Sequence, residues 1–289
     1  MSNRHSVSKS DWSGKTAVVV GASTGLGRTL ADALAAQGAA HVVLAARDIV
    51  KLQAAERQLA EEWPVTRFSM CAVDVTEASG AAALAEHVAT IGLKPGSGDA
   101  TQIDLLINAT GLSDRGPALK LTSERLDELM HANVHGPLLV IQSLVSHLSR
   151  GGVIVNIGSL SSHFAPRYLG GYSLANHALR ALTQQLRLEL KESGIHVMLV
   201  CPGPIARSDV GSPRYAHLPT AGDVPPEALG GGGGAKLRGL DPGKLSAEIL
   251  QAAAARRAEL IRPRKARLLI WLMALWPAQG EAWLRHMTR

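Results

Sequence analysis

Short apolar and β-branched runs alternate with longer Ala- and Leu-rich stretches over most of the chain. The short runs predict strands at residues 16–20, 41–45, 67–73, 104–108, 153–157 and 196–201. The longer stretches predict helices at residues 25–37, 48–62, 77–91, 123–148 and 168–193. Because a helix fills each gap between strands, the strands are expected to run parallel with right-handed crossovers. The pattern therefore predicts an α/β fold of three layers, a doubly wound parallel sheet in a single domain with a C-terminal helical extension.

The chain beyond the last of these strands is organised differently. Residues 202–243 form a connection longer than compact domains commonly contain, with a run of five glycines at residues 230–234. This connection is interpreted either as a mobile lid over a substrate cleft or as a surface insertion. Residues 242–262 are expected to be helical. The expected division of the chain is a flexible N-terminus at residues 1–12, a folded domain at residues 13–262 and a helical tail at residues 263–289.

The tail combines basic and apolar residues. Arg264, Lys265 and Arg267 precede the apolar run LLIWLMALWP at residues 268–277, and a short helical piece is expected at residues 281–286. A basic flank beside tryptophan is typical of helices that lie on a membrane surface. Such a segment can also pack on its own domain or on a sister subunit, and both interpretations stay open.

Composition excludes several classes of protein. With 46% hydrophobic and 19% charged residues among 289, the chain can bury a large core, which excludes a disordered tail and a disulfide-bonded miniprotein. Cys71 and Cys201 lie in apolar runs without a CxxC or Cys/His companion, so they are interpreted as reduced core residues, and no metal site is expected. The sequence shows neither a secretory h-region nor an apolar run of about 18 residues, so we expect a soluble cytoplasmic protein.

The charge balance indicates an acidic partner, since the net charge is +6 and the pI is near 9.6. The basic residues do not form a stripe with interleaved aromatic residues, so nucleic acid is not expected as the partner. A phosphorylated small molecule and a membrane surface both fit the charge. The choice between them depends on the motifs.

The first predicted strand ends in a glycine-rich turn that opens a helix, Gly21-Ala-Ser-Thr-Gly25-Leu-Gly27. Small residues let the backbone approach a diphosphate, and the free N–H groups of the helix N-terminus attract its charge. The spacing is GxxxGxG, and its place between a strand and a helix is typical of dinucleotide-binding Rossmann folds. The residues expected to contact the cofactor here are Gly21, Ser23, Thr24, Gly25, Leu26 and Gly27.

The end of the second predicted strand distinguishes between the two nicotinamide nucleotides. In folds that bind NAD, an acidic residue at this point accepts hydrogen bonds from the ribose hydroxyls. Here the sequence has Ala46 followed by Arg47, and a guanidinium suits a phosphate on the ribose 2′ oxygen. The sequence therefore favours NADP(H) over NAD(H).

Further motifs make the chain resemble the short-chain dehydrogenase/reductase family over residues 12–205. They are Asp74-Val75 after the third strand, Asn108-Ala109-Thr110-Gly111 after the fourth, the side chains Asn133, Ser159 and Tyr172, and the turn Pro202-Gly203-Pro204-Ile205. The spacing between Ser159 and Tyr172 is habitual in this family. The resemblance implies that the cofactor is contacted by Asp74, Val75, Asn108, Ala109, Gly111, Tyr172, Asn176, Pro202, Gly203 and Ile205.

The resemblance also implies a reaction, the reversible transfer of a hydride between NADP(H) and a carbonyl or alcohol. Ser159 would hold the substrate oxygen, and Tyr172 would donate its proton to the developing alkoxide. Asn133 would hold a relay water.

One position departs from the family pattern Tyr-x-x-x-Lys, because Asn176 stands where the resemblance implies the lysine. The i, i+4 spacing places Tyr172 and Asn176 on one helix face. An amide can hydrogen-bond to ribose, but it carries no charge that favours tyrosinate. Carbonyl reduction uses a protonated tyrosine, so it is expected to suffer less than alcohol oxidation. Arg180, one turn beyond Asn176, either reaches the ribose or faces solvent.

Two functions from different classes stay open. The first is an NADP(H)-dependent reductase in which Asn133, Ser159, Tyr172 and Asn176 form the active site. The second is an NADP(H)-binding pseudoenzyme with a sensing or partner-binding role, which the loss of the lysine supports. The retained serine, tyrosine and asparagine favour the enzyme.

The substrate is expected to be apolar. The residues behind this expectation are Pro225, Pro226, Leu229 and the glycine run of the 202–243 connection, and Leu268, Trp271 and Trp276 of the tail. Ser161, His163 and Tyr168 are expected on the substrate side of the cleft. The resemblance implies a lipid-like or steroid-like ketone as the substrate. It also implies a homodimer or homotetramer that pairs the helices at 123–148 and 168–193.

Overall fold

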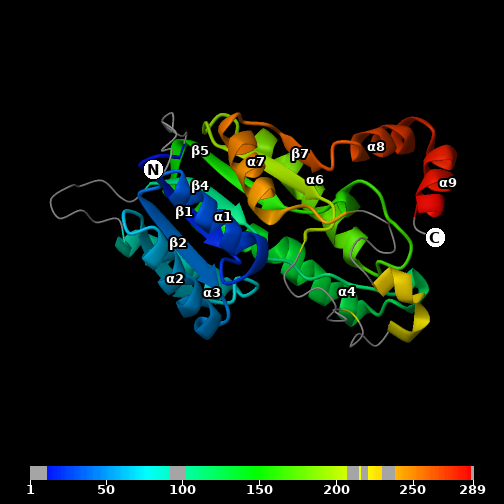
Figure 1. Cartoon of the computed structure of the whole chain (residues 1–289), viewed down its shortest axis with the longest axis horizontal. Helices are drawn as coiled ribbons and strands as arrows, with labels where there is room; N and C mark the ends of the chain where they lie inside the picture. The colour runs from blue at the N-terminus through cyan, green and yellow to red at the C-terminus, as the bar shows by residue number, and fades with distance from the viewer. Residues whose placement is uncertain (1–11, 92–101, 207–214, 216–220, 230–237, 288–289) are drawn as a thin grey trace, which may run out of the picture.

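The computed structural model describes residues 12–91, 102–206, 215, 221–229 and 238–287 (Figure 1). The expected N-terminal segment at residues 1–11 and the glycine run at residues 230–234 lie outside the described residues. Trp12 is buried, and its Nε1 donates a hydrogen bond to the carbonyl oxygen of Leu250 at 3.1 Å. The expectation of a flexible segment is therefore wrong for Trp12, because its indole packs into the core.

A parallel sheet of seven strands forms the centre of the described fold, in the order β3-β2-β1-β4-β5-β6-β7. The sheet confirms the predicted doubly wound α/β architecture. Its strands are β1 (Thr16–Val20), β2 (His41–Ala46), β3 (Arg67–Ala72), β4 (Ile103–Asn108), β5 (Leu148–Ile157), β6 (His196–Pro202) and β7 (Glu259–Arg262).

Helices cover both faces of the sheet. They are α1 (Gly25–Ala36), α2 (Ile49–Glu62), α3 (Ala78–Ile91), α4 (Ser123–Met130), α5 (Gly136–Leu144), α6 (Tyr172–Glu189), α7 (Pro242–Ala254), α8 (Ala266–Leu275) and α9 (Pro277–Met287). A π-helical turn, η2 (His131–His135), joins α4 to α5, and a short 3-10 helix, η4 (Leu160–Ser162), follows β5. None of the described helices is both long and apolar enough to cross a bilayer.

The two helical layers follow from the alternation of side chains along each buried strand. In β1, Val19 points into a cluster with α1, α2 and α7, whereas Val18 and Val20 point into a cluster with α3 and α5. A third cluster joins side chains of β6 and β7 to α6, and Leu269 of α8 and Leu284 of α9 belong to it. The tail is therefore anchored by its buried leucines, while α8 and α9 extend from the body at one end of the sheet (Figure 1).

Two helix predictions are wrong. Residues 242–262 are not one helix, because α7 ends at Ala254 and residues 259–262 pair with β6 as the edge strand β7. The predicted helix at 123–148 is divided by η2, and β5 already begins at Leu148. A segment as short as residues 259–262, Glu-Leu-Ile-Arg, has no clear periodicity of its own, so its pairing with β6 decides its conformation.

Candidate active site

A cavity of about 2010 Å³ opens at the carboxyl ends of the central strands. Its walls come from the turn after β1, the segments after β4 and β5, the first turns of α6 and the segment after β6. In doubly wound sheets this edge is where ligands bind. The cavity collects the following predicted site residues: Ser23, Thr24, Gly25, Leu26, Ala109, Gly111, Asn133, Ser159, Ser161, Tyr172, Asn176, Pro202, Gly203 and Ile205.

The turn after β1 has the geometry of a diphosphate site. Gly21 has a φ of +86°, and a Cβ at Gly27 would overlap the carbonyl oxygen of Gly21. Thr24 is the N-cap of α1, yet its side chain makes no capping hydrogen bond. The first N–H groups of α1 therefore face the cavity without a side-chain cap, and a bound anion can accept their hydrogen bonds.

Arg47 and Asp74 form an ion pair beside the end of β2, with Nη1 and Oδ2 separated by 3.6 Å. Burial opposes ionisation of Asp74, but hydrogen bonds from Thr76 and the charge of Arg47 outweigh it and lower the Asp74 pKa. The Arg47 side chain is 75% exposed, so a ligand phosphate can approach it. Val75 is buried in the core, and none of Arg47, Asp74 and Val75 lines the cavity.

Asn108 does not face the cavity, although the resemblance implied a cofactor contact. Its Nδ2 donates to Oδ1 of Asn156 at 2.9 Å, and Asn156 Nδ2 donates to Oγ1 of Thr183 at 3.0 Å. All three side chains are buried. The chain of hydrogen bonds links β4, β5 and α6 and so fixes the distance of α6 from the strands that bear the cavity.

Asn133 lies in the π-helical turn η2 and is buried. Its Oδ1 accepts from the backbone N–H of Leu112, and its Nδ2 donates to the carbonyl oxygens of Leu112 and Leu129. A Cβ at Gly111 would come within 2.7 Å of Asn133 Oδ1. The amide therefore clamps the segment after β4, which brings Gly111 against it at the cavity wall.

Ser159 and Tyr172 both line the cavity, and the Ser159 hydroxyl lies near enough to the phenol to lower its pKa. Ser159 caps η4, since its Oγ accepts from the N–H of Ser161 at 3.1 Å. Burial raises the pKa of Tyr172 and Tyr215 adds to this, whereas the Ser159 hydrogen bond, the Arg115 charge and the Asn176 hydrogen bond lower it. The net direction is upward, so the phenol is protonated at neutral pH.

Asn176 is 2% exposed, and its Nδ2 donates to the carbonyl oxygen of Tyr172 at 2.9 Å. The predicted shared helix face of Tyr172 and Asn176 agrees with this geometry, because both residues line the cavity. Arg180 does not line it. Its Nε lies 3.5 Å from Oε1 of Glu259, and its side chain is partly exposed, so it pairs with an acid on β7.

Of the three residues expected on the substrate side, only Ser161 lines the cavity. His163 points elsewhere, since its buried ring places Nε2 3.2 Å from Oε1 of Glu259. Tyr168 has a φ of +62°, and its hydroxyl accepts a hydrogen bond from Arg167 at 2.7 Å. The apolar residues Phe164 and Leu169 of the same loop face the cavity instead.

His163, Cys201 and Glu259 bring three candidate metal-ligand atoms within 4.8 Å of one another. Arg180 already supplies a positive charge to Glu259, and burial raises the pKa of the Cys201 thiol. A protonated thiol is a poor metal ligand. The group is therefore explained as an ion-pair cluster beside the cavity, and Cys71 and Cys201 are buried free cysteines, as predicted.

Sequence reasoning missed several residues that line the cavity. Ser113 and Arg115 follow β4, Tyr215 lies in the long connection after β6, and Leu269 and Trp283 belong to the C-terminal helices. Arg115 lies in the segment that follows β4. Because ligands bind at the carboxyl ends of the strands in such sheets, this position could have indicated a place in the cavity wall. The apolar character of the tail was noted, but which of its residues line the cavity depends on where α8 and α9 dock.

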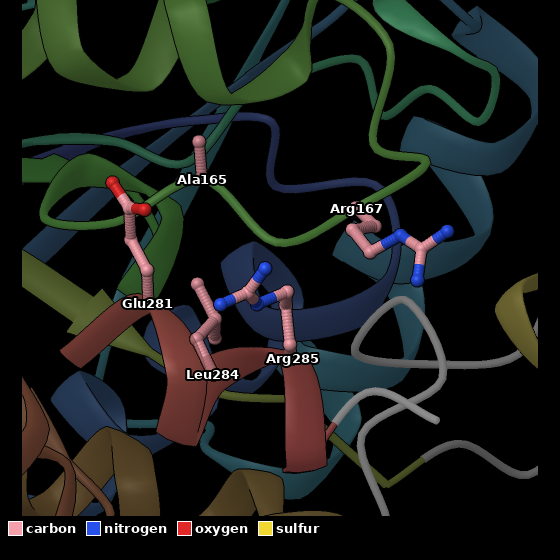
Figure 2. Close-up of a pocket in the computed structure, with 5 residues that line it drawn as sticks. All are labelled: Ala165, Arg167, Glu281, Leu284 and Arg285. Carbon is pink, nitrogen blue, oxygen red and sulfur yellow. The ribbon is translucent and has the colours of Figure 1, made fainter. Parts of the chain in front are cut away.

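A smaller pocket of about 130 Å³ lies between the loop after η4 and α9 (Figure 2). Ala165 and Arg167 come from the loop, and Glu281, Leu284 and Arg285 come from α9. The pocket is too small for a dinucleotide and contains none of the catalytic candidates. It shows that α9 rests beside the loop whose apolar residues line the large cavity.

Comparison with known proteins gives consistent matches. The family profile described as short chain dehydrogenase matches residues 15–218. Sorbitol dehydrogenase of Cereibacter sphaeroides is 33% identical over 195 residues, which are 66% of this chain and 71% of that protein. Dehydrogenase/reductase SDR family member 7B of Danio rerio is 29% identical over 272 residues, which are 91% of this chain and 82% of that protein.

A solved structure shares the architecture. The crystal structure of L-sorbose reductase from Gluconobacter frateurii, complexed with NADPH and L-sorbose, superposes with a TM-score of 0.69 at 25% identity. The superposition covers 86% of this chain and 93% of that chain. The similarity therefore extends beyond the region that the family profile matches.

Proposed function

This chain belongs to the short chain dehydrogenase family of oxidoreductases, which act on alcohol and carbonyl groups, and we propose that it reduces an apolar ketone or aldehyde with NADPH. The observation that carries this proposal is that Ser159, Tyr172 and Asn176 line one cavity together with the glycine-rich turn after β1. The test is loss of the NADPH absorbance when apolar carbonyl compounds are added to the purified protein.

The cavity residues fit a nicotinamide dinucleotide. The crowded Gly21–Gly27 contact and the uncapped start of α1 suit its diphosphate. Gly203 and Ile205, at the far end of the cavity, are proposed to hold the nicotinamide. NADPH supplies a hydride to the carbonyl carbon when it is bound.

Two side chains of the protein then bind and protonate the substrate oxygen. Ser159 Oγ donates a hydrogen bond to the carbonyl oxygen and orients it toward Tyr172. Tyr172 Oη donates its proton to the oxygen as negative charge develops there. Because burial raises the Tyr172 pKa, the protonated phenol that reduction needs is present at neutral pH, and the tyrosinate that oxidation needs forms only as pH rises through that pKa.

We propose that Arg47 makes the protein prefer NADP(H), because its exposed guanidinium can bind the 2′-phosphate. Arg47→Asp is expected to change the ratio of NADPH to NADH affinities by about 10–100-fold toward NADH, the worth of one charge-assisted hydrogen bond. Titration of both nucleotides against protein fluorescence measures the ratio. Arg57→Asp makes the same charge change on the exposed side of α2 and is expected to leave the ratio unchanged. An unchanged ratio in Arg47→Asp would contradict the assignment.

The proposed substrate class follows from the apolar side chains of the cavity wall. Phe164, Leu169, Leu269 and Trp283 are among them, whereas the acidic side chains of the lining, Asp32 and Glu62, come from α1 and the end of α2. The names of the relatives sorbitol dehydrogenase and L-sorbose reductase indicate polyhydroxylated substrates. A wall of this composition favours a lipophilic carbonyl compound here. Several described residues of the 202–243 connection line the cavity, among them Tyr215, Pro226 and Leu229, and we propose that these residues contact the substrate.

The C-terminal helices present an exposed apolar surface beside that wall. Leu268, Trp271, Leu275 and Trp276 of this surface are each more than half exposed, and Leu268 also lines the cavity. Basic residues precede α8. Tryptophan with basic flanks suits the interface of an anionic bilayer, so we propose that α8 lies on an anionic lipid surface and that the substrate enters from it.

Co-sedimentation with vesicles of phosphatidylcholine and phosphatidylglycerol tests this contact. Each change of Lys265 or Arg267 to Glu is expected to weaken binding at least about fivefold, since one basic residue near an anionic surface contributes about 1 kcal/mol. Lys191→Glu, in the exposed turn after α6, serves as the matched control and is expected to bind normally. Equal binding by all three variants would contradict the contact, and so would association of α8 with a second copy of the chain.

A second candidate is the NADP(H)-binding pseudoenzyme. The observation that favours it is Asn176, which brings an amide and no charge to Tyr172. It predicts NADPH binding without turnover of any carbonyl compound.

We also propose a homodimer or homotetramer through α4–α5 and α6, where Leu174 and Leu188 of α6 are exposed in the single chain.

A further inference from the structure

Asp114 is a buried carboxylate in the segment that follows β4. The residue is 4% exposed, and aspartate is rarely buried to this degree unless it is paired. Its Oδ1 accepts hydrogen bonds from Arg125 of α4, from Nε at 3.2 Å and from Nη2 at 3.1 Å. These two bonds compensate the burial of the charge and fix the orientation of the carboxylate.

The second carboxylate oxygen reaches the start of α6. Oδ2 of Asp114 accepts a hydrogen bond from the backbone N–H of Gly171 at 3.3 Å. Gly171 is the N-cap of α6, and Tyr172 is the first residue of that helix. A negative charge at this end is also favoured by the helix dipole. Asp114 therefore holds the backbone directly before the proposed proton donor.

The chain leaves a matching space for this carboxylate. Gly170 has a φ of +53°, and a Cβ at this position would overlap Oδ2 of Asp114. Glycine adopts this backbone conformation at little cost and leaves room for the carboxylate. Leu121 and Leu129 pack against Gly171, and neither side chain can accept a hydrogen bond. The space before α6 therefore suits the Asp114 carboxylate.

Two backbone hydrogen bonds join the same two segments of the chain. The N–H of Gly116 donates to the carbonyl oxygen of Tyr168 at 3.0 Å, and the N–H of Gly170 donates to the carbonyl oxygen of Gly116 at 2.9 Å. They hold the loop before α6 beside the segment after β4. The Asp114 side chain extends this link to Gly171, at the start of the helix.

Asp114 itself does not face the proposed reaction. Tyr172 lines the large cavity together with Ser159 and Asn176, and Asp114 is not among the described residues that line it. An effect of Asp114 on the chemistry must therefore pass through Gly171 to Tyr172.

We propose that Asp114 is a positioning residue, which holds Tyr172 in place for proton transfer to the substrate oxygen. The proposal rests on the proposed oxidoreductase function. A general acid must lie within hydrogen-bond reach of the atom that it protonates. A displacement of about 1 Å at a reacting group can lower a rate about hundredfold. The start of α6 is thus a point at which a lost contact reaches the reaction.

Removal of the carboxylate gives the first test. Asp114→Ala is expected to lower the rate constant of carbonyl reduction, measured as single-turnover NADPH consumption, by about 10–100-fold. NADPH affinity is expected to change by less than about threefold. Arg125 keeps Glu128 as a partner in this variant, which favours folding.

Asp114→Asn is the conservative variant. It keeps an acceptor oxygen for the N–H of Gly171 and loses the ion pair with Arg125. Its rate constant is expected to lie within about threefold of that of the natural protein. A rate constant as low as that of Asp114→Ala would contradict the role of the bond to Gly171.

A double-mutant cycle separates positioning from a general structural effect. Because Asp114 is proposed to act through Tyr172, Asp114→Ala is expected to slow reduction by less than about twofold when Tyr172→Phe is already present. A general structural effect would slow reduction equally in both backgrounds. Equal slowing overturns the proposal.

Asp104→Ala is the matched control, since Asp104 makes the same kinds of contact at the amino ends of β1 and β4. Its Oδ1 pairs with Lys15 at 2.9 Å, and its Oδ2 accepts from the N–H of Thr16 at 3.0 Å. The variant is expected to keep the natural rate of carbonyl reduction. Slowing as large as in Asp114→Ala would contradict a specific role of Asp114.

Fluorine NMR tests the position of Tyr172 without any turnover. The chain has three tyrosines, so fluorotyrosine labels three rings, and Tyr172→Phe identifies the resonance of Tyr172. Asp114→Ala is expected to shift or broaden this resonance, whereas Asp104→Ala leaves it in place. An unchanged Tyr172 resonance in folded Asp114→Ala overturns the proposal. A changed resonance in a protein without turnover would instead contradict the proposed function and leave the positioning contact intact.

Discussion

Tyr172→Phe is expected to lower the rate constant of carbonyl reduction by about 10²–10⁴-fold, the usual contribution of a positioned general acid. The phenol is the proposed proton donor, and it lines the cavity together with Ser159. Its loss leaves the alkoxide oxygen without a proton donor in the first turns of α6. Single-turnover consumption of NADPH with a saturating ketone measures this rate constant.

The same variant separates chemistry from binding. NADPH affinity is expected to change by less than about threefold, since the ring and the diphosphate turn stay in place. Tyr168→Phe is the matched control, because that phenol lies outside the cavity and bonds to Arg167. A reduction rate in Tyr172→Phe equal to that in Tyr168→Phe would remove Tyr172 from the mechanism.

Gly27→Ala is expected to lower NADPH affinity about hundredfold, which corresponds to about 3 kcal/mol for forcing a Cβ into a closed backbone contact. The added Cβ would overlap the carbonyl oxygen of Gly21 and come within 3.3 Å of the N–H nitrogen of Ala22. Backbone atoms cannot swing aside as a side-chain end does. The turn must open, and its N–H groups then no longer converge on a diphosphate.

Fluorescence titration with NADPH measures this loss, and urea unfolding shows whether the variant is folded. Gly243→Ala is the control in the first turn of α7, where a Cβ would meet Asp241 Oδ1 at an ordinary 3.5 Å. Its affinity is expected to match that of the natural protein. Near-normal NADPH binding by folded Gly27→Ala would contradict the placement of the diphosphate on this turn.

Six of the strands and the doubly wound class of the sheet could be predicted because buried parallel strands are short apolar runs between helical segments. β7 escaped prediction since Glu-Leu-Ile-Arg follows a helical pattern directly, and only the register with β6 makes it a strand. The division of the helix at residues 123–148 escaped for a different reason. The π-helical turn carries Asn133, whose amide holds the segment after β4. This contact joins residues distant in sequence, so the local periodicity does not indicate it.

The i, i+4 spacing predicted that Tyr172 and Asn176 share a helix face, and the family resemblance implied that Ser159 joins them. Spacing could not tell which loop residues turn inward. His163 pairs with Glu259, a partner distant in sequence, and leaves the cavity wall to Phe164. Arg115 was not predicted to line the cavity because its buried position depends on contacts with Ala228 and Tyr215, which only the folded chain brings together.

The central claim is that the chain reduces carbonyl compounds with Asn176 in place, and one measurement tests it most directly. NADPH binding and NADPH consumption are followed in parallel for the natural protein and for Asn176→Lys across a panel of apolar ketones and aldehydes. The account predicts turnover by both proteins, with alcohol oxidation gaining more than carbonyl reduction from the added lysine. Tight NADPH binding by both proteins with turnover only in Asn176→Lys would contradict it and establish the pseudoenzyme.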